Sequence, residues 1–187
     1  MMRAVWPAVI LVLTGITAPT QGETAQPDIS GTVVLLVRHA ERAAQPGDDP
    51  PLTQDGRRRA EALAGVVKDA HPTAIITTQL RRTVETARPS AAAVGVTPEV
   101  VPISSTTTQQ NAVEVAAAVR QRAGTTVLVV GHGNTVPLII AALGGPKLPD
   151  ICESVHDKPF VRVLGKEARL VQSRYGVPGP PTTADCN

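Results

Sequence analysis

Short apolar runs alternate along this chain with longer segments in which apolar residues recur every three or four positions. The runs are rich in Val, Ile and Leu and are followed directly by polar residues, which is typical of strands buried on both faces of a parallel sheet. Strands are predicted at residues 33–37, 74–77, 99–101, 126–130, 160–164 and 169–174, of which the last two are expected to be edge strands.

The segments between these runs predict helices. In the first of them Thr53 stands as a helix N-cap, and the apolar residues Ala60, Leu63 and Val67 recur at helical spacing after it. Because strands and helices alternate, we predict one α/β domain, a three-layer α/β/α sandwich with a mainly parallel sheet, over residues 33–175. Helices are predicted from Thr53 to His71 and at residues 80–94, 112–122 and 137–143.

The chain begins with the features of a secretory signal peptide. Arg3 precedes a mostly apolar run at residues 4–16, and Thr20-Gln21-Gly22 places small residues around a spacer. The apolar run is too short and too interrupted to favour an uncleaved membrane anchor. We therefore predict an exported protein, periplasmic or secreted, with no stable membrane insertion after cleavage. The predicted segments are a signal peptide at 1–22, a disordered leader at 23–32 and a Pro- and Gly-rich tail at 176–187.

The composition limits the core and the partners. Apolar residues make up 42% of the 187 residues and aromatic residues 2%, so the core must be built from Val, Leu, Ile and Ala. The formal charge of +2 is small, and no basic run is interleaved with aromatic residues. Both observations argue against a nucleic-acid partner.

The chain has two cysteines, Cys152 and Cys186. After export they would meet an environment in which disulfides persist, and a bridge between them would tether the tail. The alternative is two unpaired thiols. No CxxC pair is present, and no metal site is predicted from the cysteines.

Three predicted strand ends carry residues that suit a phosphate dianion. Arg38 and His39 follow the first strand, Arg82 lies near the start of the helix after the second, and His132 follows the strand at 126–130. Ligands bind at the carboxyl edge of open α/β sheets, so these side chains are expected to meet there. Neutral imidazole is nucleophilic near pH 7, so His39 can accept a phosphoryl group. Arg38 and Arg82 would clamp its oxygens, and His132, when protonated, would add a third donor, which makes a metal unnecessary.

These segments resemble the motifs of the histidine phosphatase superfamily, the phosphoglycerate mutase-like proteins. The resemblance covers residues 33–175 and implies a phosphoglycerate mutase-like fold, a phosphohistidine formed on His39 and no cofactor. In family order, residues 36–41 (LVRHAE) are similar to the Arg-His-Gly/Ala-Glu signature, 52–56 (LTQDG) to the next helix start, 78–87 to the segment of the second arginine, Arg82, and 129–135 (VVGHGNT) to the second-histidine motif.

The family uses an acidic residue to protonate the leaving oxygen. Where many members of the mutase branch place that acid, residues 109–111 of this chain are Gln, Gln and Asn. The remaining candidates are Glu41, Glu85 and Glu114. We select Glu41 because it stands two residues after His39, beside the carboxyl end of the first strand.

The remaining polar residues and one glycine are interpreted as follows. Asn134 either binds phosphate or caps the helix that follows it. Gly133 stands where the phytase-like branch has Asp, which sets that branch aside. The basic run at residues 57–59 is expected on a solvated helix face, His71 is expected to be structural, and His156 is expected at the surface.

The predicted function is a metal-independent phosphomonoesterase that acts outside the cytoplasm through a phosphohistidine. Its partner would be a phosphorylated sugar of an envelope glycolipid, a small phosphate ester or a phosphoprotein. A catalytically weak phosphate-binding module is the alternative, motivated by the residues at 109–111. A phosphomutase is a third reading, and the short stretch between Arg82 and His132 argues against it because it leaves little chain for a lid.

Overall fold

The computed structural model describes residues 2, 31–44, 47, 49–103 and 107–179. The predicted signal peptide and leader, apart from residues 2, 31 and 32, lie outside this set, as do Cys186 and the end of the predicted tail. No helix within these ranges is long and apolar enough to cross a membrane.

A six-stranded sheet forms the centre of the domain, in the order β3-β2-β4-β1-β5-β6. The first four strands in this order pair in parallel, and β5 and β6 are antiparallel. The predicted mainly parallel sheet is confirmed, but only β6 of the last pair is an edge strand, because β5 pairs with β1 as well. The strands are β1 Val33–Arg38, β2 Ala74–Thr77, β3 Glu99–Val100, β4 Thr126–Gly131, β5 Phe160–Val163 and β6 Arg169–Gln172.

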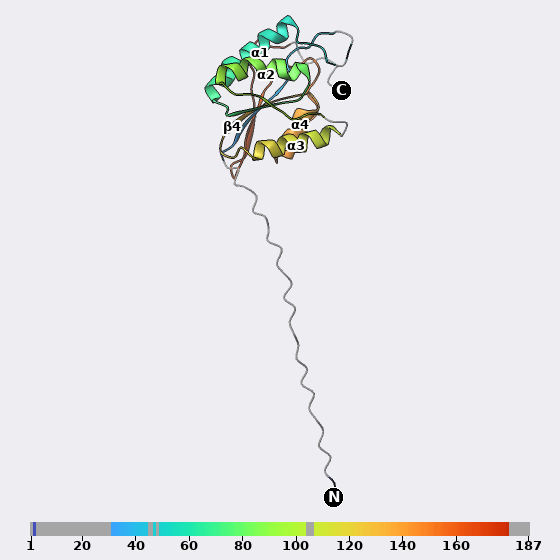
Figure 1. The fold of residues 1–187 in the computed structure, drawn as a ribbon, viewed down its shortest axis with the longest axis vertical. Coiled ribbons are helices and arrows are strands. Elements are labelled where there is room, and N and C mark those ends of the chain that lie inside the picture. Colours follow the sequence, from blue (N-terminus) through green and yellow to red (C-terminus); the bar gives the residue numbers. More distant parts are fainter. Residues whose placement is uncertain (1, 3–30, 45–46, 48, 104–106, 180–187) are drawn as a thin grey trace.

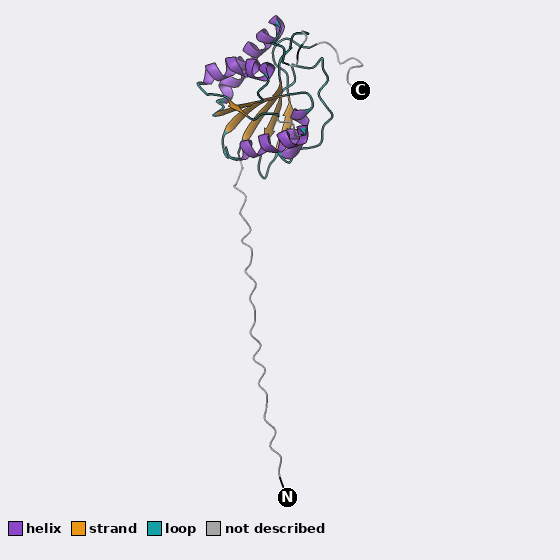
Figure 2. Ribbon diagram, turned by 45° about the vertical axis from the view of Figure 1, so that its right-hand side comes forward, coloured by secondary structure: helices purple, strands orange, loops and turns teal. Residues whose placement is uncertain are grey.

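Helices cover both faces of the sheet, as Figures 1 and 2 show. Two of them, α1 and α2, pack together on one face, and α3 and α4 pack together on the other. The three-layer α/β/α sandwich predicted from the alternation of elements is therefore confirmed. The helices are α1 Gln54–Val67, α2 Arg81–Val94, α3 Thr108–Arg120 and α4 Thr135–Ala142, and a short 3₁₀ helix, η1 Lys68–Ala70, extends α1.

The core is aliphatic and is divided by the sheet. Along β4, Val127 and Val129 belong to the cluster on the α3 and α4 side, whereas Leu128 and Val130 belong to the cluster on the α1 and α2 side. Alternate side chains of a strand point to opposite faces, so a continuous apolar run fills both layers. This burial fixes the sheet whose carboxyl edge carries the site.

Side-chain caps set the starts of α1 and α3. The Thr53 hydroxyl accepts a hydrogen bond from the backbone N–H of Gly56 at 2.9 Å, as the N-cap prediction requires. Thr107 caps α3 in the same way by accepting from the N–H of Gln110. This second cap starts α3 four residues before the predicted position of 112, because polar Thr and Gln residues occupy its first turn, where apolar spacing gives no signal.

Candidate active site

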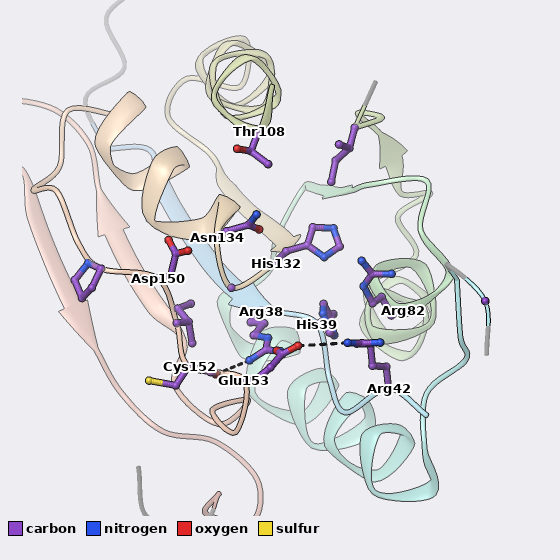
Figure 3. A pocket seen from close by; sticks show the side chains of 15 residues that line it. Arg38, His39, Arg42, Arg82, Thr108, His132, Asn134, Asp150, Cys152 and Glu153 are labelled. Carbon is purple, nitrogen blue, oxygen red and sulfur yellow. Dashed lines mark hydrogen bonds and ion pairs between the residues drawn. The ribbon is translucent and has the colours of Figure 1, made fainter. Parts of the chain in front are cut away.

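A pocket of about 890 Å³ opens at the carboxyl ends of β1 and β4 (Figure 3). The parallel pairing of Arg38 with Gly131 places the residues that follow the two strands side by side. The backbone N–H of His39 donates to the carbonyl of Gly131 at 2.9 Å, and the rings of His39 and His132 lie 5.3 Å apart. Side chains that line the pocket include Arg38, His39, Arg82, His132 and Asn134.

The ring of His39 is held in one tautomer. Its Nδ1 lies 2.8 Å from the carbonyl oxygen of Ala40, and a carbonyl only accepts, so Nδ1 carries the hydrogen and Nε2 keeps its lone pair. Burial lowers the pKa of His39 to about 2, the hydrogen bond to Ala40 opposes this shift, and the charges of His132 and Arg38 add to it. At neutral pH the ring is therefore an uncharged nucleophile.

A chain of hydroxyl groups fixes the other histidine. The Thr83 hydroxyl donates to backbone carbonyls, among them that of Leu80 at 2.8 Å, so its contact with the Thr78 hydroxyl at 2.9 Å is one in which Thr78 donates. Thr78 then accepts from Nε2 of His132, 3.2 Å away, which leaves Nδ1 of His132 without a hydrogen. Burial, with the charges of Arg82 and Arg38, lowers the pKa of His132 to about 4. In the free protein this ring is neutral at pH 7, rather than the third positive donor.

Arg38 and Arg82 bring positive charge and spare donors to the pocket. Burial, followed by the charges of Arg42 and Arg82, lowers the pKa of Arg38 to about 10, and burial also lowers that of Arg82. The Nε atoms of Arg38 and Arg82 are buried and have no hydrogen-bond partner within the described part of the chain. Arg81 is 55% exposed and pairs with Glu85, so Arg82 is the arginine that reaches the pocket. An anion between the two guanidinium groups would relieve this crowding of charge.

Glu41 does not line the pocket that holds His39. Its carboxylate accepts from Nε of Arg59 at 2.8 Å, and Arg59 also donates to the carbonyls of Tyr175 and Val177. Burial alone would raise the pKa of Glu41, but the hydrogen bonds and charge of Arg59 bring it below the usual value. A carboxylate held ionised in this way is a poor proton donor, which argues against the role of general acid expected for Glu41. Arg59 is 8% exposed, so its predicted place on a solvated face is wrong.

The other acid candidates also lie elsewhere. Glu85 accepts from the backbone N–H of Leu52 at 2.8 Å, and Glu114 accepts from Gln110 on the exposed side of α3. The carboxylates that do line the pocket are Asp150 and Glu153, which sequence reasoning missed. They follow α4 in an irregular segment without a local motif, so their position depends on tertiary contacts.

Those contacts join the segment after α4 to the second-histidine motif. The backbone N–H of Ile151 donates to the carbonyl of Gly133 at 2.9 Å. A Cβ atom at Gly133 would lie 2.7 Å from the carbonyl oxygen of Ile151, so only glycine permits this approach. The Arg38 guanidinium donates to the carbonyl of Cys152 and pairs with Glu153, which also contacts Arg42 at 3.4 Å. The segment therefore closes one side of the pocket.

His156 lies beside the nucleophile rather than in the predicted surface position. Its Nδ1 donates to the backbone carbonyl of His39 at 2.8 Å, and the two rings are 5.9 Å apart. Asn134 occupies the N-cap position of α4, but its side chain makes no capping hydrogen bond and lines the pocket. Its amide is therefore available to a bound ligand.

Cys152 is disulfide-bonded, and Cys186, its predicted partner, lies outside the described residues, so their pairing stays a prediction. In the ranges that the structure describes, no group of three or more His, Cys, Asp or Glu side chains is arranged to hold a metal ion.

The protein is an α/β/α sandwich with a pocket lined by two histidines and three arginines at the carboxyl edge of its sheet. The model of the histidine phosphatase superfamily (branch 1) matches residues 34–103. This segment of the chain, which contains Arg38, His39 and Arg82, is similar to the histidine phosphatase superfamily, and the match supports the predicted histidine-type phosphatase.

Solved structures share the fold at low identity. SixA from Agrobacterium tumefaciens is 23% identical with a TM-score of 0.56, over 79% of this chain and 99% of that chain. The protein histidine phosphatase SixA complexed with tungstate is 18% identical with a TM-score of 0.60, over 76% and 95%. A mycobacterial glucosyl-3-phosphoglycerate phosphatase is 16% identical with a TM-score of 0.57, over 76% and 97%. No curated protein matches the chain by sequence.

Proposed function

We propose that the protein is a metal-independent phosphomonoesterase that acts through a phosphohistidine on His39. The main support is an uncharged imidazole with a bare Nε2 that stands in a pocket beside two arginines, whose Nε atoms have no hydrogen-bond partner among the described residues. Phosphoryl transfer requires a nucleophile placed in line and positive groups around the equatorial oxygens, and these residues meet both needs.

The reaction has two steps. In the first, Nε2 of His39 forms a bond to phosphorus while the bond from phosphorus to the leaving oxygen breaks, and that oxygen keeps the electron pair and takes a proton from solvent. In the second, water attacks the phosphohistidine and gives a proton to solvent, the phosphorus–nitrogen bond breaks with its electron pair returning to Nε2 of His39, and inorganic phosphate leaves with the water oxygen. Arg38 and Arg82 hold the equatorial oxygens in both steps, and His132 donates once the bound anion has raised its pKa.

The positions of the acidic side chains indicate which leaving groups the enzyme can expel. Glu41 does not line the pocket and is paired with Arg59, and Glu153 is paired with arginines, so neither is placed to give a proton in the free protein. Esters whose leaving oxygen needs little protonation should therefore react best. The same observation favours a second candidate substrate, a phosphorylated histidine of a protein, because imidazole leaves readily. Two of the structurally similar proteins are SixA, one of them a protein histidine phosphatase, which supports this candidate.

We further propose that the protein is exported. The support is the Arg3, apolar run and small-residue pattern at the start of the sequence. The natural ester would then lie outside the cytoplasm. A fusion of residues 1–30 to a reporter that folds only after export tests this proposal, and retention of the reporter in the cytoplasm would contradict it.

The test of the function is phosphate release from 4-nitrophenyl phosphate, with and without a metal chelator. We expect activity to survive the chelator and to fall by at least about 1,000-fold in His39→Ala, because the nucleophile is lost. His71→Asn is the matched control: His71 is remote at the end of η1, with a left-handed backbone that Asn tolerates. Equal activity in His39→Ala would overturn the nucleophile assignment, and an inactive native protein that still binds phosphate would favour the phosphate-binding module.

A further inference from the structure

The pocket holds more positive charge than one phosphate needs, and part of that charge is already neutralised. Arg38, Arg42 and Arg82 are the arginines among its lining residues. The carboxylate of Glu153 pairs with Arg38 and lies 3.4 Å from Arg42, and Figure 3 shows it between the two guanidinium groups. Asp150 lines the same pocket on the side of Asn134.

We propose that Glu153, together with Asp150, makes the pocket selective for substrates in which a single phosphate is attached to a carrier without further negative charge. This inference rests on the proposed function, whose substrate class it narrows. The accepted carriers are neutral or cationic, and the rejected substrates are bisphosphates, nucleoside diphosphates and triphosphates, and phosphorylated carboxylic acids.

The charges support this selectivity. A phosphate dianion between Arg38 and Arg82 would be neutralised by these two cations and would displace the Glu153 carboxylate from Arg38. Arg42 is the remaining partner of Glu153, and it is 44% exposed, so the displaced carboxylate has a cation within reach. A second anionic group on the substrate would then find no unpaired arginine among the described residues that line the pocket, and it would meet Glu153 or Asp150, whose charges repel it.

The two carboxylates cannot move far from the pocket. Between them in the chain, Ile151 is bonded to the carbonyl of Gly133, and the carbonyl of Cys152 accepts from the Arg38 guanidinium. If the backbone at Asp150 or Glu153 moved out of the pocket, the hydrogen bond from Ile151 to Gly133 or the one from Arg38 to Cys152 would break. Their negative charge is therefore a fixed property of the pocket rather than that of a freely moving loop.

The inference can be tested with two substrates that share the same three-carbon skeleton. Glycerol 3-phosphate has a neutral carrier, and 3-phosphoglycerate has a carboxylate in place of a hydroxymethyl group. We expect the native protein to have a higher kcat/KM for glycerol 3-phosphate. In Glu153→Gln the ratio of the two values should fall by about 5-fold, as expected for removal of one partly exposed like charge. The ratio cancels any general effect that the substitution has through Arg38.

The matched control is Glu167→Gln. Glu167 follows β5, which ends beside the start of β1, so it lies at the end of the sheet opposite to the pocket, where it is 88% exposed and contacts Arg169. The ratio should be unchanged in this variant. A native preference for 3-phosphoglycerate, or the same ratio in native protein and Glu153→Gln, would overturn the inference while leaving the phosphatase intact.

Calorimetric binding provides a readout that does not depend on turnover. Native protein should bind inorganic phosphate more tightly than pyrophosphate, and Glu153→Gln should reduce that difference by a similar factor. Binding with this preference but no phosphate release from any ester would contradict the proposed function and leave the charge selectivity standing. Tighter binding of pyrophosphate by native protein would overturn the selectivity.

Discussion

The two walls of the pocket come from different parts of the chain and are held differently. The strand wall consists of Arg38, which ends β1, and of His39, Arg82 and His132, which follow β1, β2 and β4. Its histidines and Arg38 are at most 6% exposed. The loop wall consists of residues 149–153 after α4, and Glu153 in it is 63% exposed. The strand wall is fixed by the sheet and the core, whereas the loop wall is fixed by a few hydrogen bonds.

This difference separates two tasks. Groups that react with phosphorus must be held in line, and burial behind the sheet gives them that rigidity and keeps both imidazoles neutral. Groups that select the carrier of the phosphate need only present charge at the mouth of the pocket. Changes in the strand wall should therefore alter the rate for every substrate, and changes in the loop wall should alter the choice among substrates.

Replacement of Arg82 by Ala is the strongest way, short of removing His39, to break the strand wall. We expect kcat/KM for 4-nitrophenyl phosphate to fall by about 100-fold, because one guanidinium that stabilises the equatorial oxygens is lost. Arg81→Ala is the control, since Arg81 precedes it in the chain but is exposed and pairs with Glu85. Similar losses in both variants would show that Arg82 has no special place in the pocket.

Replacement of Glu41 by Gln tests a residue that lies in neither wall. Arg59 would lose the carboxylate that neutralises it in a mostly buried position, so the free energy of unfolding should fall by about 2 to 3 kcal/mol. Activity at a temperature where the variant is folded should change by less than about 10-fold. Glu114→Gln, on the surface of α3, should alter neither quantity. A loss of activity of about 100-fold or more in Glu41→Gln would instead restore Glu41 as the general acid.

Acid should weaken the fold through the buried histidines of the strand wall. An unfolded histidine has a pKa of about 6.5, whereas the pKa values of His39 and His132 in the folded protein are about 2 and about 4. Below pH 6.5 the unfolded chain therefore binds protons that the folded chain does not. The free energy of unfolding should fall with decreasing pH, by about 1 kcal/mol per pH unit for each histidine.

Urea denaturation at pH 7 and pH 5 measures this slope. His132→Gln should lose less stability across the interval than native protein, whereas His71→Asn should lose the same amount. The pKa values of Glu41, Glu85 and Asp157 are lowered, so their contributions are present above the ordinary range of acidic side chains and are lost only at lower pH. Identical slopes in native protein and His132→Gln would contradict a neutral His132.

The elements and the strand wall were predictable because their signals are local. Arg38 and His39 directly follow an apolar run, and His132 follows another, so the rule that ligands bind at the carboxyl edge brings them together without further information. The start of α1 could also be predicted from Thr53, because an N-cap side chain bonds to a residue within three positions of itself.

The loop wall was not predictable because its place depends on contacts between distant residues. Glu41 stands two residues from His39, but β1 has ended there and the chain turns its carboxylate towards Arg59 on α1. Glu153 is over a hundred residues from Arg38, and it reaches the pocket through the glycine-dependent approach of Ile151 to Gly133. His156 was misplaced likewise, since nothing nearby in the sequence marks its bond to the carbonyl of His39. For these three residues, proximity in sequence was a poor guide to proximity in the structure.

The opposite tautomers of the paired histidines give the pocket a spectroscopic signature. His39 carries its hydrogen on Nδ1, fixed by the Ala40 carbonyl, and His132 carries its hydrogen on Nε2, fixed by the Thr78 hydroxyl. Nitrogen-15 resonances of imidazole separate protonated from bare ring nitrogens, so the two rings should give mirror-image patterns in one spectrum. Binding of an anion would place a hydrogen on the bare Nδ1 of His132. The resonance pattern of His132 should then change, whereas that of His39 should persist.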